Sequence, residues 1–174
     1  MVARLSPASH VTSILCEKMR LDVDEALSFA SGGMRRLRRL QLLHVELRYK
    51  PHWRVAARLA PRYGRTLEEV EVHVVVDGLT SVARCRRPGD IERDLGHKEV
   101  EAGLVAAPSV DAEAAETAAR QSIRQLAHRK RAILRQVQSL ELYFKPVYLL
   151  SEAPDVPPRY VVDAHTGALA RALP

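Results

Sequence analysis

The residues in this sequence most able to do chemistry are arginines at helical spacing. Five basic side chains recur every three or four residues and would share one face of a helix: Arg120, Arg124, His128, Arg131 and Arg135. A second cluster holds the related place in the first part of the chain: Arg35, Arg36, Arg38 and Arg39. Because Arg donates two parallel hydrogen bonds to phosphate, two such helices could grip a nucleic-acid backbone.

Two observations weigh against this nucleic-acid hypothesis. A charged stripe opposite an apolar one is typical of any surface helix, and neither stripe contains the exposed aromatic side chains that stack on single strands. The net charge of +6 is carried mostly by Arg, which a GC-rich genome also produces. Nucleic-acid binding is therefore the alternative function.

Two aspartates occupy corresponding places in the chain and could in principle form a carboxylate pair. Asp77 and Asp163 each precede a small residue, in Val-Asp-Gly and Val-Asp-Ala. A duplicated fold could bring them to a common axis, as acid and base catalysis would require. Capping of a hairpin turn explains both residues more simply, so we expect a structural role for them and no catalytic residue.

Metal, cofactor and nucleophile motifs are missing from the sequence. The seven histidines have no helical i, i+4 pair with acidic support, and Cys16 and Cys85 lie in unrelated contexts. There is no glycine-rich phosphate loop and no Gly-x-Ser-x-Gly elbow. The sequence therefore predicts a protein that is not an enzyme and that uses no metal or cofactor.

Two short motifs occur twice in the chain, in the same order, and we call this internal repeat the echo. The segment Glu46–Trp53, with its Tyr-Lys-Pro, returns as Glu141–Tyr148, with Phe-Lys-Pro, and Val74–Thr80 returns as Tyr160–Thr166. Two motifs that recur in the same order indicate a duplicated chain. We assign structural roles to the repeated residues, which are Tyr49, Pro51, Trp53, Asp77, Phe144, Pro146, Tyr148, Asp163 and Gly167.

The second copy predicts a long helix followed by strands. Residues 112–137 contain no Gly or Pro and show helical spacing of apolar side chains after a capping segment at 108–111. Residues 140–150 and 159–162 then alternate as strands, and 168–173 would return after a turn.

The first copy predicts the same plan with two differences. Its helical part, 8–43, is interrupted at 21–24 and at the glycine pair 32–33, and its inter-strand loop carries an insertion at 52–73. We expect a bulge at each proline of the echo, since proline cannot donate to a strand ladder. Residues 84–107 form either a mobile crossover or a third strand with a short helix.

A bent strand with aromatic-x-Pro-x-aromatic, followed by Val-Asp-Ala-x-Thr-Gly at a hairpin tip, resembles the PepSY and cystatin-like class of small domains. The tip at 160–167 is most similar, and 76–81 is a weaker version that has lost the second glycine. The resemblance implies a helix packed across a curled antiparallel sheet, and a binding or inhibitory module. It transfers no active-site residue.

These observations lead to one expected architecture. We expect an α+β fold made of two tandem helix-plus-antiparallel-hairpin repeats, each with a long helix on a curled antiparallel sheet: a first repeat at 1–88, a connecting segment at 89–107 and a second repeat at 108–174. No apolar run reaches the roughly 20 residues of a membrane span, and a cytoplasmic location fits the cysteine usage.

The expected function follows from sheet edges that a small sheet leaves unpaired. We expect a non-catalytic binding or assembly component that contacts a protein partner, or forms a homo-oligomer, through these edges and its helix faces.

Overall fold

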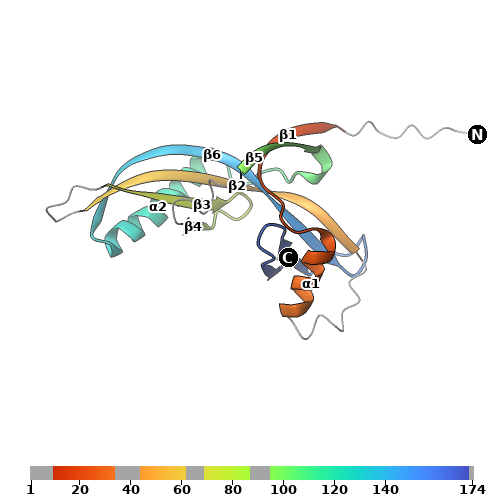
Figure 1. Ribbon diagram of the computed structural model, residues 1–174. Coiled ribbons are helices and arrows are strands. Elements are labelled where there is room, and N and C mark those ends of the chain that lie inside the picture. Colours follow the sequence, from red (N-terminus) through yellow and green to blue (C-terminus); the bar gives the residue numbers. More distant parts are fainter. Residues whose placement is uncertain (1–9, 34–43, 62–68, 87–94, 173–174) are drawn as a thin grey trace, which may run out of the picture.

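The computed structural model describes residues 10–33, 44–61, 69–86 and 95–172. Its elements are β1 (Val11–Glu17), α1 (Val23–Gly33), β2 (His44–Pro61), β3 (Val70–Asp77), β4 (Ala83–Arg86), β5 (Leu95–Glu101), the 3-10 helix η2 (Ala102–Leu104), α2 (Ala112–Arg129), β6 (Ala132–Ser151), β7 (Tyr160–Asp163) and β8 (Leu169–Arg171). The described strands form one eight-stranded sheet. Figure 1 shows it as a long arch. We call 10–86 the first half and 95–172 the second half.

The arch is built on two long strands that pair antiparallel over their whole length, from His44 opposite Ser151 to Pro61 opposite Ala132. The two echo segments meet at its centre, where Lys50 lies directly opposite Lys145. Tyr49 faces Pro146, and Pro51 faces Phe144, so the pairing repeats itself about a local pseudo-two-fold axis.

The two central prolines lie just before each long strand begins to pair with a hairpin. The pairing of β2 with β3 starts at His52, and the pairing of β6 with β7 starts at Val147. A missing N–H therefore removes no bond from either pairing. The expected bulges at Pro51 and Pro146 are wrong, because the register shifts of this pair lie between Ala56 and Leu59.

The hairpins β3–β4 and β7–β8 attach to the long strands through matching hydrogen bonds. The amide of Gly78 donates to the Pro51 carbonyl at 2.9 Å, and the amide of Ala164 donates to the Pro146 carbonyl at 3.0 Å. Asp77 Oδ1 accepts from the amides of residues 79 and 80, and Asp163 Oδ1 accepts from those of residues 165 and 166. Each carboxylate thus caps its own turn.

Each helix begins at an aspartate and is tied to the long strand of the other half. Asp22 Oδ1 accepts from the amide of Glu25 and Asp111 Oδ1 from that of Ala114, both at 2.8 Å. One residue before these caps, the Leu21 carbonyl accepts from Tyr148 Oη at 3.0 Å. The matching bond runs from Trp53 Nε1 to the Val110 carbonyl at 2.9 Å.

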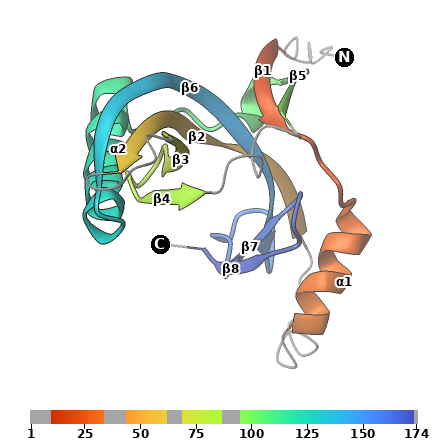
Figure 2. The same ribbon diagram turned by 60° about the vertical axis from the view of Figure 1, so that its left-hand side comes forward.

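The helices therefore cross over to the opposite hairpins. Helix α2 of the second half packs on β2, β3 and β4 of the first half as well as on β6 of its own half, with buried Ala115, Ala119 and Ile123 against Val55 and Val74. Helix α1 of the first half contacts β7 and β8 of the second. Figure 2 shows α1 and α2 on opposite flanks, with the hairpins between them beneath β2 and β6.

A pair of shorter strands completes the sheet. β1 and β5 run antiparallel, from Val11 opposite Glu101 to Glu17 opposite Leu95. A single parallel bridge joins β1 to β6, at Cys16 and Phe144, and an isolated parallel bridge joins β2 to the residue after η2, at Tyr49 and Val105.

The expected fold class is wrong. Two tandem helix-plus-hairpin units would give each half its own sheet under its own helix. The structure instead has one continuous sheet of eight strands, and each helix covers the hairpin of the other half. Strands, not long helices, dominate the described residues.

The expected elements fail at three particular places. The helix expected over 112–137 ends at Arg129, and 132–151 form a strand because β2 supplies a full-length pairing partner. The helical part expected over 8–43 contains β1, and its residues 34–43 lie outside the described part. The expected insertion at 52–73 is largely the continuation of β2 and the start of β3.

The segment 84–107 had two expected forms, a crossover or a strand with a short helix. Its described residues contain the end of β4, then β5 and the 3-10 helix η2. The second form is the one observed there, and residues 87–94 lie outside the described part.

Candidate functional site

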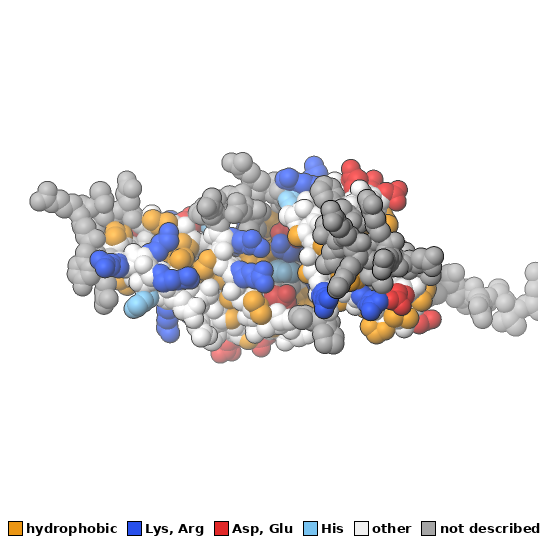
Figure 3. Space-filling model, turned by 90° about the horizontal axis from the view of Figure 1, so that it is seen from below, with side chains coloured by type: hydrophobic (Ala, Val, Ile, Leu, Met, Phe, Trp, Pro, Cys, Tyr) orange, Lys and Arg blue, Asp and Glu red, His pale blue; other side chains and the backbone are white. Residues whose placement is uncertain are grey.

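A hollow of about 620 Å³ lies between the two hairpins, beneath the centre of the long strands. We call it the central hollow. Its lining residues come from both halves: Glu17, Lys50, His52, Val75, Asp77, Arg84, Arg86, Tyr143, Lys145, Val147, Val161, Asp163, His165, Thr166, Ala168 and Ala170. Seen from below the arch, Lys and Arg side chains gather with a histidine around this part of the surface (Figure 3).

Four cations line the central hollow. Lys145 Nζ lies 3.2 Å from Glu17 Oε1, so its charge is compensated. Lys50, Arg84 and Arg86 have no carboxylate within ion-pair distance in the described parts of the chain. The Lys50–Lys145 pairing also sets like charges directly opposite each other, which disfavours the strand pair.

The acidic residues of the hollow are already engaged. Asp77 and Asp163 each accept two backbone N–H groups through one carboxylate oxygen, and Glu17 pairs with Lys145. These hydrogen bonds hold the carboxylates in place and do not remove their negative charge. Four cations thus face three carboxylates, and Lys50, Arg84 and Arg86 are the cations of the hollow without an ion-pair partner in the described parts of the chain.

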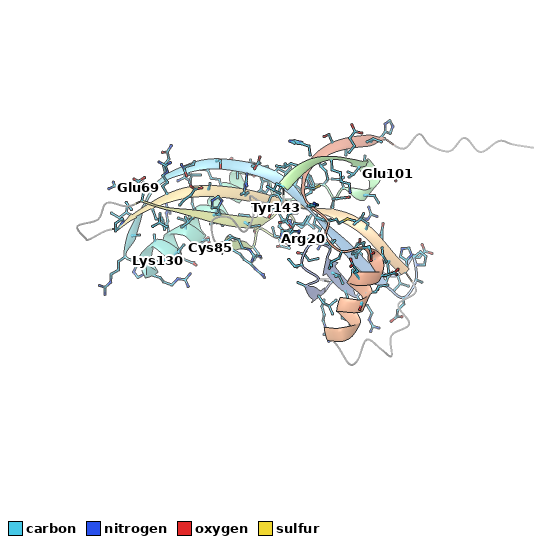
Figure 4. The ribbon with its side chains drawn as sticks, in the orientation of Figure 1. Arg20, Glu69, Cys85, Glu101, Lys130 and Tyr143 are labelled. Atoms are coloured by element: carbon cyan, nitrogen blue, oxygen red, sulfur yellow. The ribbon has the colours of Figure 1, made fainter. Side chains whose placement is uncertain are left out.

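Tyr143 lies at the floor of the hollow, near the middle of the arch (Figure 4). Its side chain is fully buried, and its hydroxyl has no hydrogen-bond partner among the described residues. Burial raises the pKa of Tyr143 well above its usual range, and the nearby Glu17 raises this pKa further. The hydroxyl therefore keeps its proton and can donate a hydrogen bond into the hollow.

His52 packs beside this tyrosine, with 5.7 Å between the ring centroids of His52 and Tyr143. Burial lowers the pKa of His52 to about 4, and Lys145 and Lys50 lower it as well. The ring is therefore neutral at pH 7. Its Nδ1 lies 3.2 Å from the Lys50 carbonyl, which only accepts, so Nδ1 carries the proton.

The two walls of the hollow differ although they are built alike. Val75 pairs with Arg84 across β3–β4, and the corresponding Val161 pairs with Ala170 across β7–β8. Arg84 and Arg86 therefore make one wall basic, whereas the other wall combines the apolar Val161, Ala168 and Ala170 with Asp163, His165 and Thr166. A ligand with a negative end and an apolar body matches this arrangement.

A second hollow of about 360 Å³ lies beside β1 and β5 and includes Cys16, Tyr49 and Lys98. Lys98 Nζ donates to Tyr49 Oη at 3.1 Å, so both polar groups are satisfied. Burial is the main cause that raises the pKa of Cys16. Its thiol stays protonated at pH 7, which leaves this hollow without a reactive nucleophile.

The structure separates the arginines expected on one helical face. Arg120 and Arg124 lie on α2, and Arg120 is paired with Glu116 at 2.6 Å. Arg131 lies in the turn after the helix, and Arg135 lies on β6. The single stripe from Arg120 to Arg135 is therefore interrupted, since the helix ends at Arg129. Arg35, Arg36 and Arg39 lie outside the described residues.

Of the echo residues, Tyr49, Pro51, Phe144 and Pro146 meet at the centre of the β2–β6 pair, and Asp77 and Asp163 line the hollow. Sequence reasoning did not single out His52, Arg84, Arg86 or Tyr143 as site residues. One signal could have pointed to two of them: when the turns at Asp77 and Asp163 are aligned, Arg84 and Arg86 stand where the second copy has Ala170 and Ala172.

Comparison of the chain with protein-family models, with curated proteins and with solved structures gives no match. The PepSY and cystatin-like resemblance therefore stays a prediction.

Two further findings concern the described part of the chain alone. None of its helices has the length and apolar character needed to cross a membrane. No group of three or more His, Cys, Asp and Glu side chains in it is placed to hold a metal ion.

Proposed function

We propose that the protein is a non-catalytic binding or assembly component that contacts a partner chain, or a second copy of itself, through the edge of its sheet. Strand addition at a sheet edge provides main-chain hydrogen bonds and requires no catalytic group. A cytoplasmic location belongs to the same proposal and rests on the cysteine usage alone.

The observation that supports this proposal is the unequal pairing of β6. One side of β6 pairs with β2 along the whole strand. Its other side meets β1 only at Phe144 and β7 only over 147–150. The stretch 132–143 therefore has an edge without a strand partner among the described residues, and unpaired edges of this length invite another strand.

The exposed side chains of this stretch suit a contact with another chain. Ile133 is 42% exposed although it is a large apolar residue. Arg135 and Gln138 alongside it are exposed and polar. An apolar side chain with polar neighbours is typical of the composition of protein interfaces.

Size-exclusion chromatography with light scattering, followed by amide hydrogen exchange, tests the proposal. We expect either a dimer or a stable complex with a strand donor, in which the amides of 132–143 become protected. Ile133→Lys should weaken the association, because an edge lysine disfavours strand addition. The matched control Val156→Lys changes another exposed apolar residue outside the strands. A monomer whose edge amides exchange equally in every sample would contradict the proposal.

Nucleic-acid binding is a second proposal, supported by exposed cations near the end of α2. Arg124, Arg129 and Arg131 are all exposed and have no ion pair with a described residue. Gel-shift titrations over a range of salt concentrations test it, since phosphate contacts weaken steeply with salt. Arg124→Gln with Arg131→Gln should abolish the shift, and an unchanged shift would reject these residues.

A further inference from the structure

We propose that the central hollow binds a small organic anion, whose phosphate or carboxylate group is held by Arg84, Arg86 and Lys50 and whose apolar body lies against the β7–β8 wall. This site goes beyond the sheet-edge function, because it lies between the hairpins and shares only Tyr143 with the stretch 132–143.

The first argument is that three cations of the hollow have no ion-pair partner in the described parts of the chain. Lys50 and Lys145 face each other across the central strand pair, and both line the hollow. Glu17 neutralises only Lys145. Arg84 and Arg86 add two guanidinium groups from β4. A bound oxyanion would neutralise these cations, and Arg is well suited to hold its oxygens in pairs.

The second argument is the buried hydroxyl of Tyr143. Buried polar groups in folded proteins are nearly always hydrogen-bonded, so an unpartnered hydroxyl calls for an explanation. Tyr143 lines the hollow, and its buried hydroxyl carries its proton and has no partner among the described residues. A ligand oxygen at the floor of the hollow would accept this hydrogen bond.

The third argument is the difference between the two walls. Opposite the arginines, the β7–β8 wall offers the apolar Val161, Ala168 and Ala170, beside the polar Asp163, His165 and Thr166. The three apolar side chains are short and leave room beside the basic wall. The volume of about 620 Å³ lies within the range of small-molecule sites. The ligand is therefore amphipathic, with one charged group and an aliphatic or aromatic body.

Isothermal titration calorimetry on the full chain tests the site with three probes: inorganic phosphate, hexyl phosphate and hexanoate. Ionic strength is held constant with sodium chloride. We expect hexyl phosphate, hexanoate or both to bind at least tenfold more tightly than inorganic phosphate. Binding of hexyl phosphate alone would assign a phosphorylated ligand, and binding of hexanoate alone would assign a carboxylate. Equal affinity for all three probes, or no binding by any, would overturn the proposal.

Variants locate the binding in the hollow. Arg84→Ala combined with Arg86→Ala should weaken binding of the amphipathic probe at least tenfold. Arg171→Ala, an exposed residue of β8 that does not line the hollow, should leave the affinity unchanged. Tyr143→Phe should weaken binding severalfold without lowering the urea midpoint, because the hydroxyl is unpartnered in the free protein. Unchanged affinity in the double arginine variant, with its circular dichroism intact, would reject the site.

Discussion

Replacement of Ile123 by alanine tests whether α2 is docked on the opposite half of the sheet. Ile123 is fully buried and belongs to the cluster formed with Val55, Val74 and Val76. The change removes its two γ carbons and its δ carbon. At about 0.8 kcal/mol for each buried carbon, the lost transfer free energy is about 2.4 kcal/mol. The cavity that remains adds about 1 kcal/mol, so we expect a loss of about 3 to 4 kcal/mol.

Urea denaturation measures this loss with two signals. Trp53 is the single tryptophan of the chain and packs against the same cluster, so its fluorescence reports on the docked hairpin. Far-ultraviolet circular dichroism reports on the whole sheet. The two transitions should coincide, because the sheet is continuous across both halves. Arg124→Ala is the matched control on the same helix and should change stability by no more than about 0.5 kcal/mol.

A loss below about 1 kcal/mol for Ile123→Ala would refute this reasoning, because a fully buried isoleucine cannot be truncated so cheaply in a packed interface. Separate transitions for fluorescence and circular dichroism would also contradict it. They would mean that the two halves unfold as independent units.

Two other perturbations have defined outcomes. Because the pKa of His52 is about 4 in the folded protein and 6.5 in its ordinary state, the unfolded chain binds the proton more readily. Stability should therefore fall as pH decreases from 6.5 towards 4. Between pH 7 and pH 5, the free energy of unfolding of His52→Gln should fall by about 2 kcal/mol less than that of the wild type, as measured by urea titrations. Equal losses would contradict a buried neutral imidazole. In Gly78→Ala, the new Cβ would lie 2.8 Å from the Pro51 carbonyl oxygen. Ala164 tolerates a Cβ at the matching place, so a small shift should suffice and the cost should be about 1 kcal/mol by thermal unfolding, whereas an unchanged melting temperature would contradict the contact.

Local signals in the sequence identified turns and caps better than they identified long elements. The capping segment before residue 112 and the aspartate turn at 163 depend on a few neighbouring residues, and both are present. The first helix begins in the same way, at Asp22, but the segment 21–24 was interpreted as an interruption of a helix. Alignment of Asp22 with Asp111 would have shown that this segment is a start signal.

The local pattern of apolar residues does not predict where α2 ends. Ile133, Leu134 and Val137 fit a helical period as well as a strand, and no glycine marks the reversal. Arg131 makes the turn instead, with a φ of 50°. The strand forms because β2 offers a partner along the whole of β6. Such long-range pairing outweighs local preference and leaves little trace in the segment itself.

The central hollow was hidden for a related reason. Its charged residues come from separate stretches of the chain, and the pairing of Lys50 with Lys145 is what brings those stretches together. Arg84 and Arg86 lie on β4 in a part of the sequence without a firm period. The echo revealed that two similar segments exist, but it did not reveal that they pair with each other.

The crossing of the helices has a consequence for how such a chain could arise. A polypeptide of half this length could cover its hairpin with a helix only by exchanging helices with an identical neighbour, as in a domain-swapped homodimer. Fusion of two such genes would replace concentration-dependent assembly with an intramolecular one. After such a fusion, the two walls of the central hollow would no longer be encoded by the same sequence. One wall could then acquire arginines while the other carried alanines.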